Sequence, residues 1–232
     1  ERWRASLVKE FQYLPNLDAL LGGPAKPPAA APSSAAPASR SAGTIDWESV
    51  GPYPARGKAE AARLLSRPGA DTTVQDHFWD AIRRQQPQRL ALALQAGADV
   101  RALSDTKSTP LIELAEQCHG GKPELAQSLA DQLIAAKADP TGVDEIGRTA
   151  LVEGAPACPI AIIRAFIAAG VPLNIVDKSG QTAMRRAINA GRVDVVNLLI
   201  DAGVDPRKEP YNANREATGN KAMQDALRRR PK

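Results

Sequence analysis

Apolar and polar positions follow a helical period in two consecutive blocks in the C-terminal part of the chain. Residues 182–205 read TAMRRAINAGRVDVVNLLIDAGVD, where apolar side chains recur three and four positions apart, as on one face of an α-helix. Gly191 separates the two blocks and Gly203 follows the second; glycine at these places is typical of a turn and of a helix end. The pattern predicts a helical hairpin.

The same plan recurs three times upstream. Residues 149–170 start 33 positions earlier with Thr-Ala-Leu and close with a glycine. Residues 109–139 start with Thr-Pro-Leu, have seven extra residues between their two blocks, and carry Lys137 in place of the closing glycine. Residues 76–99 close with Gly-Ala-Asp. We therefore predict four full units over residues 76–206.

Two shorter segments flank these units. Residues 57–71 align without a gap with residues 191–205, and residues 219–227 (GNKAMQDAL) align with residues 180–188 (GQTAMRRAI). These matches predict capping half repeats at 57–71 and 219–229. Since each hairpin must bury its apolar face against a neighbour, we expect an all-α array of stacked units.

A turn and two helices in about 33 residues, with a Thr-Pro-Leu opening and a Gly-Ala-Asp close, resembles the ankyrin repeat. The likeness covers roughly residues 46–230 and implies an ankyrin solenoid of stacked helical hairpins with β-hairpin or turn connections. It also implies that Thr109, Thr149 and Thr182 cap first helices. Glycines such as Gly97 and Gly170 would stop second helices in the left-handed conformation.

This sequence departs from the family pattern in several places. The histidine that usually follows Thr-Pro-Leu is absent from all four units. In the third unit, Gly154, Pro156 and Pro159 disfavour helix, since glycine costs about 1 kcal/mol and proline about 3 kcal/mol inside one. We therefore expect the first helix of that unit to be short.

Cys118 and Cys158 each lie nine residues after the opening Thr of their unit, so stacking should make them neighbours. Packed helices lie about 8–10 Å apart, whereas a disulfide needs Cα atoms about 4.4–6.8 Å apart. The extra residues beside Cys118 could close this gap. The sequence leaves two alternatives open: a disulfide, or two partly buried free thiols.

The first part of the chain differs in character. Residues 1–21 carry apolar side chains at helical spacings and predict an N-terminal amphipathic helix, which docks on the repeats or on a partner. Residues 22–45 are rich in Pro, Ala and Ser, and such a composition predicts a linker. The first residues are charged and are not followed by the apolar segment of a signal peptide, so no signal peptide is predicted. Because the first residue is not Met, the sequence leaves open whether a leader has been removed. It also leaves open whether the protein lies in the cytoplasm or in the bacterial periplasm.

Composition narrows the function further. No run approaches the roughly 20 apolar residues of a membrane span. The net charge is +4, and residues 182–232 hold eleven Lys or Arg against six Asp or Glu; their only stacking aromatic is Tyr211, so nucleic-acid binding is not favoured. Two His and two Cys are too few for a metal site without carboxylates, and the adjacent Cys118 and His119 are not placed as nucleophile and base. We predict no enzyme, cofactor or small-molecule substrate.

The resemblance instead implies a protein partner on the concave face, at outward positions of the first helices. In this chain those positions are Trp79, Asp80, Arg83, Ile112, Glu113, Glu116, Val152, Glu153, Arg185, Arg186 and Asn189. The loop tips are further expected contacts: Arg101, Asp105, Lys107, Asp144, Glu145, Lys178 and Ser179. Trp79 is the first choice as an exposed anchor, the alternative being that it only covers the end of the core.

These observations predict a non-catalytic protein-interaction module. A narrower hypothesis, suggested by the bacterial style of the Ala/Pro-rich linker, is an inhibitor or immunity-type protein of a bacterial enzyme or toxin. The alternative is a scaffold or assembly factor that uses the N-terminal helix for one partner and the repeats for another.

Overall fold

The computed structural model describes residues 57–66, 72–120, 122–229 and 231, so the predicted N-terminal helix (1–21) and linker (22–45) lie outside the described residues. The described ranges contain eleven α-helices, two 3-10 helices and no strand. The connections expected as β-hairpins or turns are therefore turns. The α-helices are α3 (Lys58–Leu65), α4 (Val74–Arg83), α5 (Pro87–Ala96), α6 (Pro110–Glu116), α7 (Pro123–Ala135), α8 (Ala150–Gly154), α9 (Ile160–Ala168), α10 (Ala183–Asn189), α11 (Val193–Asp201), α12 (Ala213–Glu216) and α13 (Lys221–Leu227). The 3-10 helices are η1 (Gln117–His119) and η2 (Pro206–Lys208).

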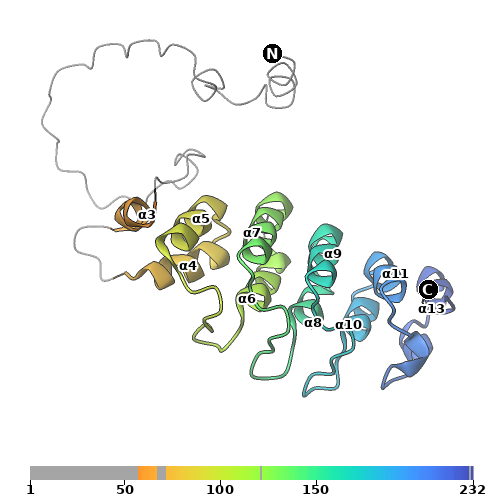
Figure 1. The fold of residues 1–232 in the computed structure, drawn as a ribbon. Coiled ribbons are helices and arrows are strands. Elements are labelled where there is room, and N and C mark those ends of the chain that lie inside the picture. Colours follow the sequence, from red (N-terminus) through yellow and green to blue (C-terminus); the bar gives the residue numbers. More distant parts are fainter. Residues whose placement is uncertain (1–56, 67–71, 121, 230, 232) are drawn as a thin grey trace, which may run out of the picture. The chain divides into compact units, whose positions relative to one another are not determined.

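The helices form two layers (Figure 1). In the first layer α4, α6, α8, α10 and α12 pack one against the next; in the second, α3, α5, α7, α9, α11 and α13 do the same. Each hairpin contributes one helix to each layer, as α4 and α5 or α10 and α11 do. The predicted all-α solenoid of stacked hairpins is confirmed.

One continuous apolar core runs between the layers. Leu111, Leu151 and Met184 recur at the same position of successive first helices and are buried. Leu129 and Phe166 face them from the second layer and are fully buried as well. Burying a side chain of this size contributes about 1.5–3 kcal/mol, and here the neighbouring unit supplies much of the cover.

Helix starts follow the predicted caps in two of three cases. The hydroxyls of Thr149 and Thr182 accept hydrogen bonds from the amides of Val152 and Arg185 at 3.2 and 3.0 Å. Thr109 occupies the same position but makes no such bond, so that prediction is wrong. Its methyl group is turned toward Gly142, where an added Cβ would lie 2.3 Å from it.

Helix ends follow the glycine pattern. Gly97, Gly170 and Gly203 have φ angles of 92°, 90° and 107°, in the left-handed region that glycine tolerates. Lys137, which replaces this glycine in the second unit, adopts φ 63° without changing the geometry of the stop. The short first helix expected in the third unit is also confirmed, because α8 has only five residues.

The C-terminal unit differs from the alignment. Residues 219–227 were matched with a first helix, but α13 packs against α11, which is a second helix. The first-layer position is filled by the four-residue α12, which packs on α10 and is capped by Asn212. The prediction of a half repeat at 219–229 is therefore wrong: the unit is a short but complete hairpin.

Candidate functional site

The apolar side chains predicted on the first-helix surface are buried. Ile112 and Val152 are fully buried, and Trp79 is 8% exposed. These positions face the neighbouring first helices, because α4, α6 and α8 pack directly on one another. Trp79 also makes an edge-to-face contact with Phe78, with ring centroids 5.0 Å apart. The expectation that these side chains are exposed is wrong, and Trp79 covers the core, as in the alternative stated above.

Two of the three predicted glutamates, Glu113 and Glu153, are buried as well, and each is paired across a unit boundary. Glu113 accepts a hydrogen bond from Nε of Arg83 in the first unit at 2.7 Å, and this bond raises the pKa of Arg83. Glu153 pairs with Arg186 of the fourth unit at 3.1 Å and with Arg148 of its own unit. These buried carboxylates join units, which leaves little of their surface for a partner.

Arg148 extends this network at the base of its loop. Its guanidinium lies 2.7 Å from the carboxylate of Asp144 and 3.5 Å from that of Glu116. Burial raises the pKa of Glu116, with the nearby Glu113 acting in the same direction. The charges at these first-helix positions are thus largely compensated within the protein.

The remaining predicted positions keep part of their surface. Asp80 pairs with Arg89 at 3.0 Å, and Arg185 pairs with Glu216 at 2.7 Å while its guanidinium stacks 4.9 Å from the Tyr211 ring centroid. Asn189, at the end of α10, is exposed. The positions that retain partial exposure are Asp80, Arg83, Glu116, Arg185, Arg186 and Asn189.

A different surface stands out on the loops that lead into the first helices. Leu103, Val143 and Val176 each lie six residues before the N-cap threonine of α6, α8 and α10, and they are 56%, 45% and 48% exposed. We call these three residues the loop row. Of the described residues, only two other large apolar side chains are comparably exposed, Ile146 in the second of these loops and Leu64 on α3. The helical pattern did not indicate the loop row, although an apolar residue that recurs at one place in polar loops is a visible signal in the sequence.

Each loop is closed by its own hydrogen bonds. The Asp144 carboxylate accepts from the amides of Ile146 and Arg148 at 3.0 and 2.8 Å. Asp177 does the same for Ser179 and Gln181, both at 2.8 Å. Asp144, predicted as a loop-tip contact, is therefore buried and structural. In the first loop the Ser104 hydroxyl takes this role, accepting from the Ser108 amide at 3.1 Å.

Neighbouring loops are also joined to one another. Lys178 donates its backbone amide to the Ile146 carbonyl at 2.9 Å and its ammonium group to the Glu145 carbonyl at 2.7 Å. The ammonium group of Lys107 lies 3.0 Å from the Glu145 carboxylate. The three loops project side by side from the same edge of the stacked hairpins (Figure 1). The loop row is thus held in place before any partner arrives.

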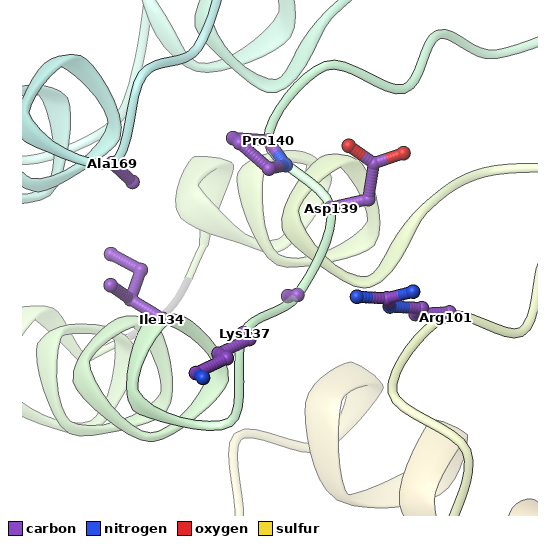
Figure 2. A pocket seen from close by; sticks show the side chains of 7 residues that line it. Arg101, Ile134, Lys137, Asp139, Pro140 and Ala169 are labelled. Atoms are coloured by element: carbon purple, nitrogen blue, oxygen red, sulfur yellow. The ribbon is translucent and has the colours of Figure 1, made fainter.

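A pocket of about 520 Å³ lies between the ends of the second and third units (Figure 2). Arg101 and Lys137 line it together with Asp139. A hydrogen bond from the Thr141 amide holds the pKa of Asp139 below its usual value, so its negative charge offsets one of the two cations. The pocket lining therefore carries charges of both signs.

Other kinds of site find no support in the described ranges. They contain no group of His, Cys, Asp and Glu side chains arranged to hold a metal ion. Cys118 forms a disulfide with Cys158 and so has no free thiol beside His119. No helix among the described residues is long and apolar enough to cross a membrane.

Comparisons with known proteins agree with the observed architecture. A family model described as ankyrin repeats (three copies) matches residues 121–210. The chain is also similar to the E3 ubiquitin-protein ligase KEG of Arabidopsis thaliana, with 36% identity over 80 residues. That match covers 34% of this chain but only 5% of the ligase, so it concerns one segment of a much longer protein.

Proposed function

We propose, on the premise that this chain carries ankyrin repeats, that it is a non-catalytic module which binds a protein partner through the loop row. The observation that carries the proposal is the exposure of Leu103, Val143 and Val176 at one register position of three adjacent loops. Stacked repeats of this kind present extended surfaces that bind partners, and the loop row is an exposed apolar surface that recurs with the repeat.

The physical case rests on preorganisation. An apolar side chain that is already held in its bound position loses little freedom on binding, so more of its burial appears as affinity. Burying a leucine contributes about 1.5–3 kcal/mol, which corresponds to roughly a 10- to 100-fold change in dissociation constant. Charged neighbours such as Lys107 and Glu145 would form the polar rim that surrounds the apolar centre of most protein interfaces.

The partly exposed residues of the first helices extend this surface. We propose that Asp80, Arg83, Glu116, Arg185, Arg186 and Asn189 lie beside the partner as secondary polar contacts. Most of them already pair within the protein, so their substitution should weaken binding less than substitution of the loop row.

The narrower form of the proposal is an inhibitor or immunity-type protein whose rigid loops cover the active site of a bacterial enzyme or toxin. The alternative is a scaffold that holds a second partner through residues 1–21. Deletion of residues 1–43 separates the two: an inhibitor that uses the repeats keeps its full effect on the partner's activity, whereas a scaffold loses one of two interactions.

A matched pair of substitutions tests the loop row itself. Immobilised wild-type protein, Leu103→Ser and Leu64→Ser are compared for capture of proteins from the source organism by quantitative mass spectrometry. Leu64 is 47% exposed, so the same chemical change is made at similar exposure away from the loops. A protein that wild type and Leu64→Ser retain equally, and that Leu103→Ser loses about tenfold, is the expected result. Equal recovery by all three proteins would exclude the loop row as the binding surface.

A further inference from the structure

The disulfide joins two units at the edge opposite the loop row. Cys118 lies in η1, directly after α6, and Cys158 lies two residues before α9. Their Cα atoms are 4.8 Å apart although the residues are separated by 40 positions. Packed helices alone would leave a wider gap; the chain closes it because η1 and the residues before α9 leave the helical path.

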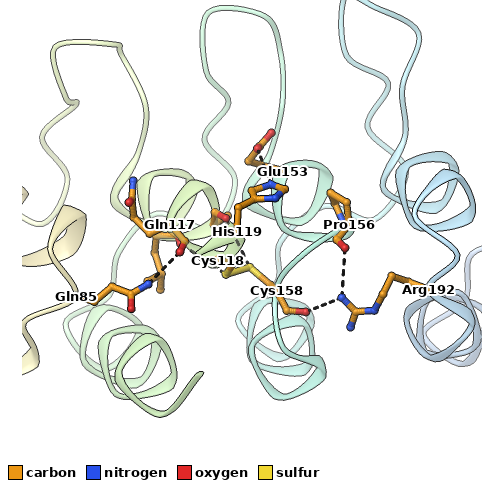
Figure 3. Close-up of a disulfide and its surroundings, with 10 residues drawn as sticks. Gln85, Gln117, Cys118, His119, Glu153, Pro156, Cys158 and Arg192 are labelled. Carbon is orange, nitrogen blue, oxygen red and sulfur yellow. Dashed lines mark hydrogen bonds and ion pairs between the residues drawn. A yellow bond between two sulfur atoms is a disulfide. The ribbon is translucent and has the colours of Figure 1, made fainter. Parts of the chain in front are cut away.

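The bond belongs to a row of contacts that crosses all four units (Figure 3). The side-chain Nε2 of Gln85, which follows α4, donates a hydrogen bond to the backbone carbonyl of Gln117 at 3.0 Å. The guanidinium of Arg192, before α11, donates to the Cys158 carbonyl at 3.0 Å. The disulfide is therefore the central and covalent member of a row that is otherwise made of side-chain hydrogen bonds.

The third unit is the one that needs this support. Its first helix, α8, has five residues and is followed by Pro156 and Pro159, which lack amide hydrogens. Gly154 lies so close to Cys158 that an added Cβ would be 3.0 Å from its Sγ. The sulfur thus packs on the backbone that ends α8, and the bond ties this short helix to α6 of the second unit.

The two cysteines differ in exposure. Cys158 is fully buried, whereas Cys118 is partly exposed beside the exposed His119. A thiolate approaching from solvent can reach the Cys118 sulfur first. Attack there would form a mixed disulfide on Cys118 and release Cys158 as a thiolate, which takes up a proton.

We propose that the Cys118–Cys158 bond is a redox-controlled cross-link that keeps the third unit docked on the second. A dithiol reductant opens it in two steps. The first thiolate of the reductant forms the mixed disulfide at Cys118. The second thiolate of the same reductant then attacks the reductant sulfur of this mixed disulfide and releases Cys118 as a thiolate, which takes up a proton. Two electrons pass from the dithiol to the protein, which gains two thiols while the reductant becomes a disulfide. Opening the bond loosens α8 and α9 against α6 and α7.

The test uses the full chain and dithiothreitol as the dithiol probe. Wild type and the double variant Cys118→Ala/Cys158→Ala are melted with and without the reductant, and thiol alkylation followed by mass spectrometry verifies the redox state. Because a cross-link across about 40 residues strongly restricts the unfolded chain, reduction should lower the wild-type melting temperature by on the order of 10 °C. The reductant should not change the melting temperature of the double variant.

Hydrogen exchange locates the effect. Reduction of the wild type should increase amide exchange in residues 150–169 more than in α11. With a single-thiol probe, glutathione, the first mixed disulfide should form on Cys118. The proposal fails if verified reduction leaves melting and exchange unchanged, if exchange increases uniformly along the chain, if glutathione is found first on Cys158, or if both thiols of protein isolated without reductant are already free. Because wild type is compared with itself, a poorly folding double variant would not decide the outcome.

Discussion

Replacing Glu153 with alanine removes the carboxylate that joins three units. Its side chain is 7% exposed and pairs with Arg148 of its own unit, with Arg186 of the next, and more distantly with His119 of the previous one. Breaking a buried ion pair by removing one partner typically costs about 3–5 kcal/mol, because the other charge stays buried and unpaired.

The two arginines reduce this cost. The Arg148 and Arg186 side chains are 21% and 23% exposed, and Arg148 keeps its bond to Asp144 at 2.7 Å. We therefore expect Glu153→Ala to lower the free energy of unfolding by about 2–3 kcal/mol. For a chain of this size that corresponds to a fall of about 4–12 °C in melting temperature.

The assay is equilibrium unfolding in urea followed by circular dichroism at a helix wavelength. Glu145→Ala is the matched control, because Glu145 also pairs with a cation, Lys107, but both side chains are more than half exposed. Such exposed pairs contribute about 0–1 kcal/mol. If the two variants lie within about 0.5 kcal/mol of each other, close to the scatter expected of ordinary surface substitutions, the cross-unit network does not stabilise the array as described.

Two further predictions concern backbone conformation and burial. Lys137→Gly should raise the free energy of unfolding by about 0.5–1 kcal/mol, because the left-handed conformation costs a non-glycine residue about 1–2 kcal/mol. Gly170→Ala should lower the free energy of unfolding for the same reason. The urea midpoints of the two variants should therefore shift in opposite directions, and shifts in the same direction would contradict this prediction. Burial raises the pKa of Glu209, against the opposing hydrogen bond from Thr182, so the folded chain keeps this proton to higher pH than the unfolded chain does. The free energy of unfolding should therefore contain a component that is fully present below the ordinary glutamate pKa and is lost as pH rises from there through the raised pKa of the folded chain; Glu209→Gln should lack it, and identical pH profiles from pH 4 to 7 would show that Glu209 is not coupled to folding.

The repeat architecture could be predicted because it depends on residues that lie within or next to each helix. Threonine before an apolar block and glycine after it act on the ends of the adjacent helix, so Thr149 and Thr182 cap first helices and Gly170 ends a second helix, as expected. The short α8 was predictable for the same reason, since its cause is the backbone of its own residues.

The site could not be predicted equally well, because exposure depends on the spacing of neighbouring units. Ile112 and Val152 point outward from their own helices, yet the next first helix covers them. Residues 219–227 resemble a first helix, but the preceding α12 already occupies that layer. Both errors come from packing partners distant in sequence, which a single helical pattern does not encode.

The loop row could be predicted in part. Its period is visible in the sequence, since Leu103, Val143 and Val176 each stand six residues before the threonine that precedes a first helix. Their exposure follows from the hydrogen bonds that close each loop and join it to the next, including that from Lys178 to Ile146. Apolar residues that repeat within polar connections are the signal that marks them in the sequence.

Site-specific photo-crosslinking in cells of the source organism tests the binding surface most directly. A benzophenone amino acid is placed at Val143 in one protein and at Asp131, which is exposed on α7 in the other layer, in a second. We predict that irradiation yields one defined covalent adduct with another protein from position 143 and none from position 131. An adduct that forms only from position 131 would contradict the assignment of the loop edge as the surface that meets the partner.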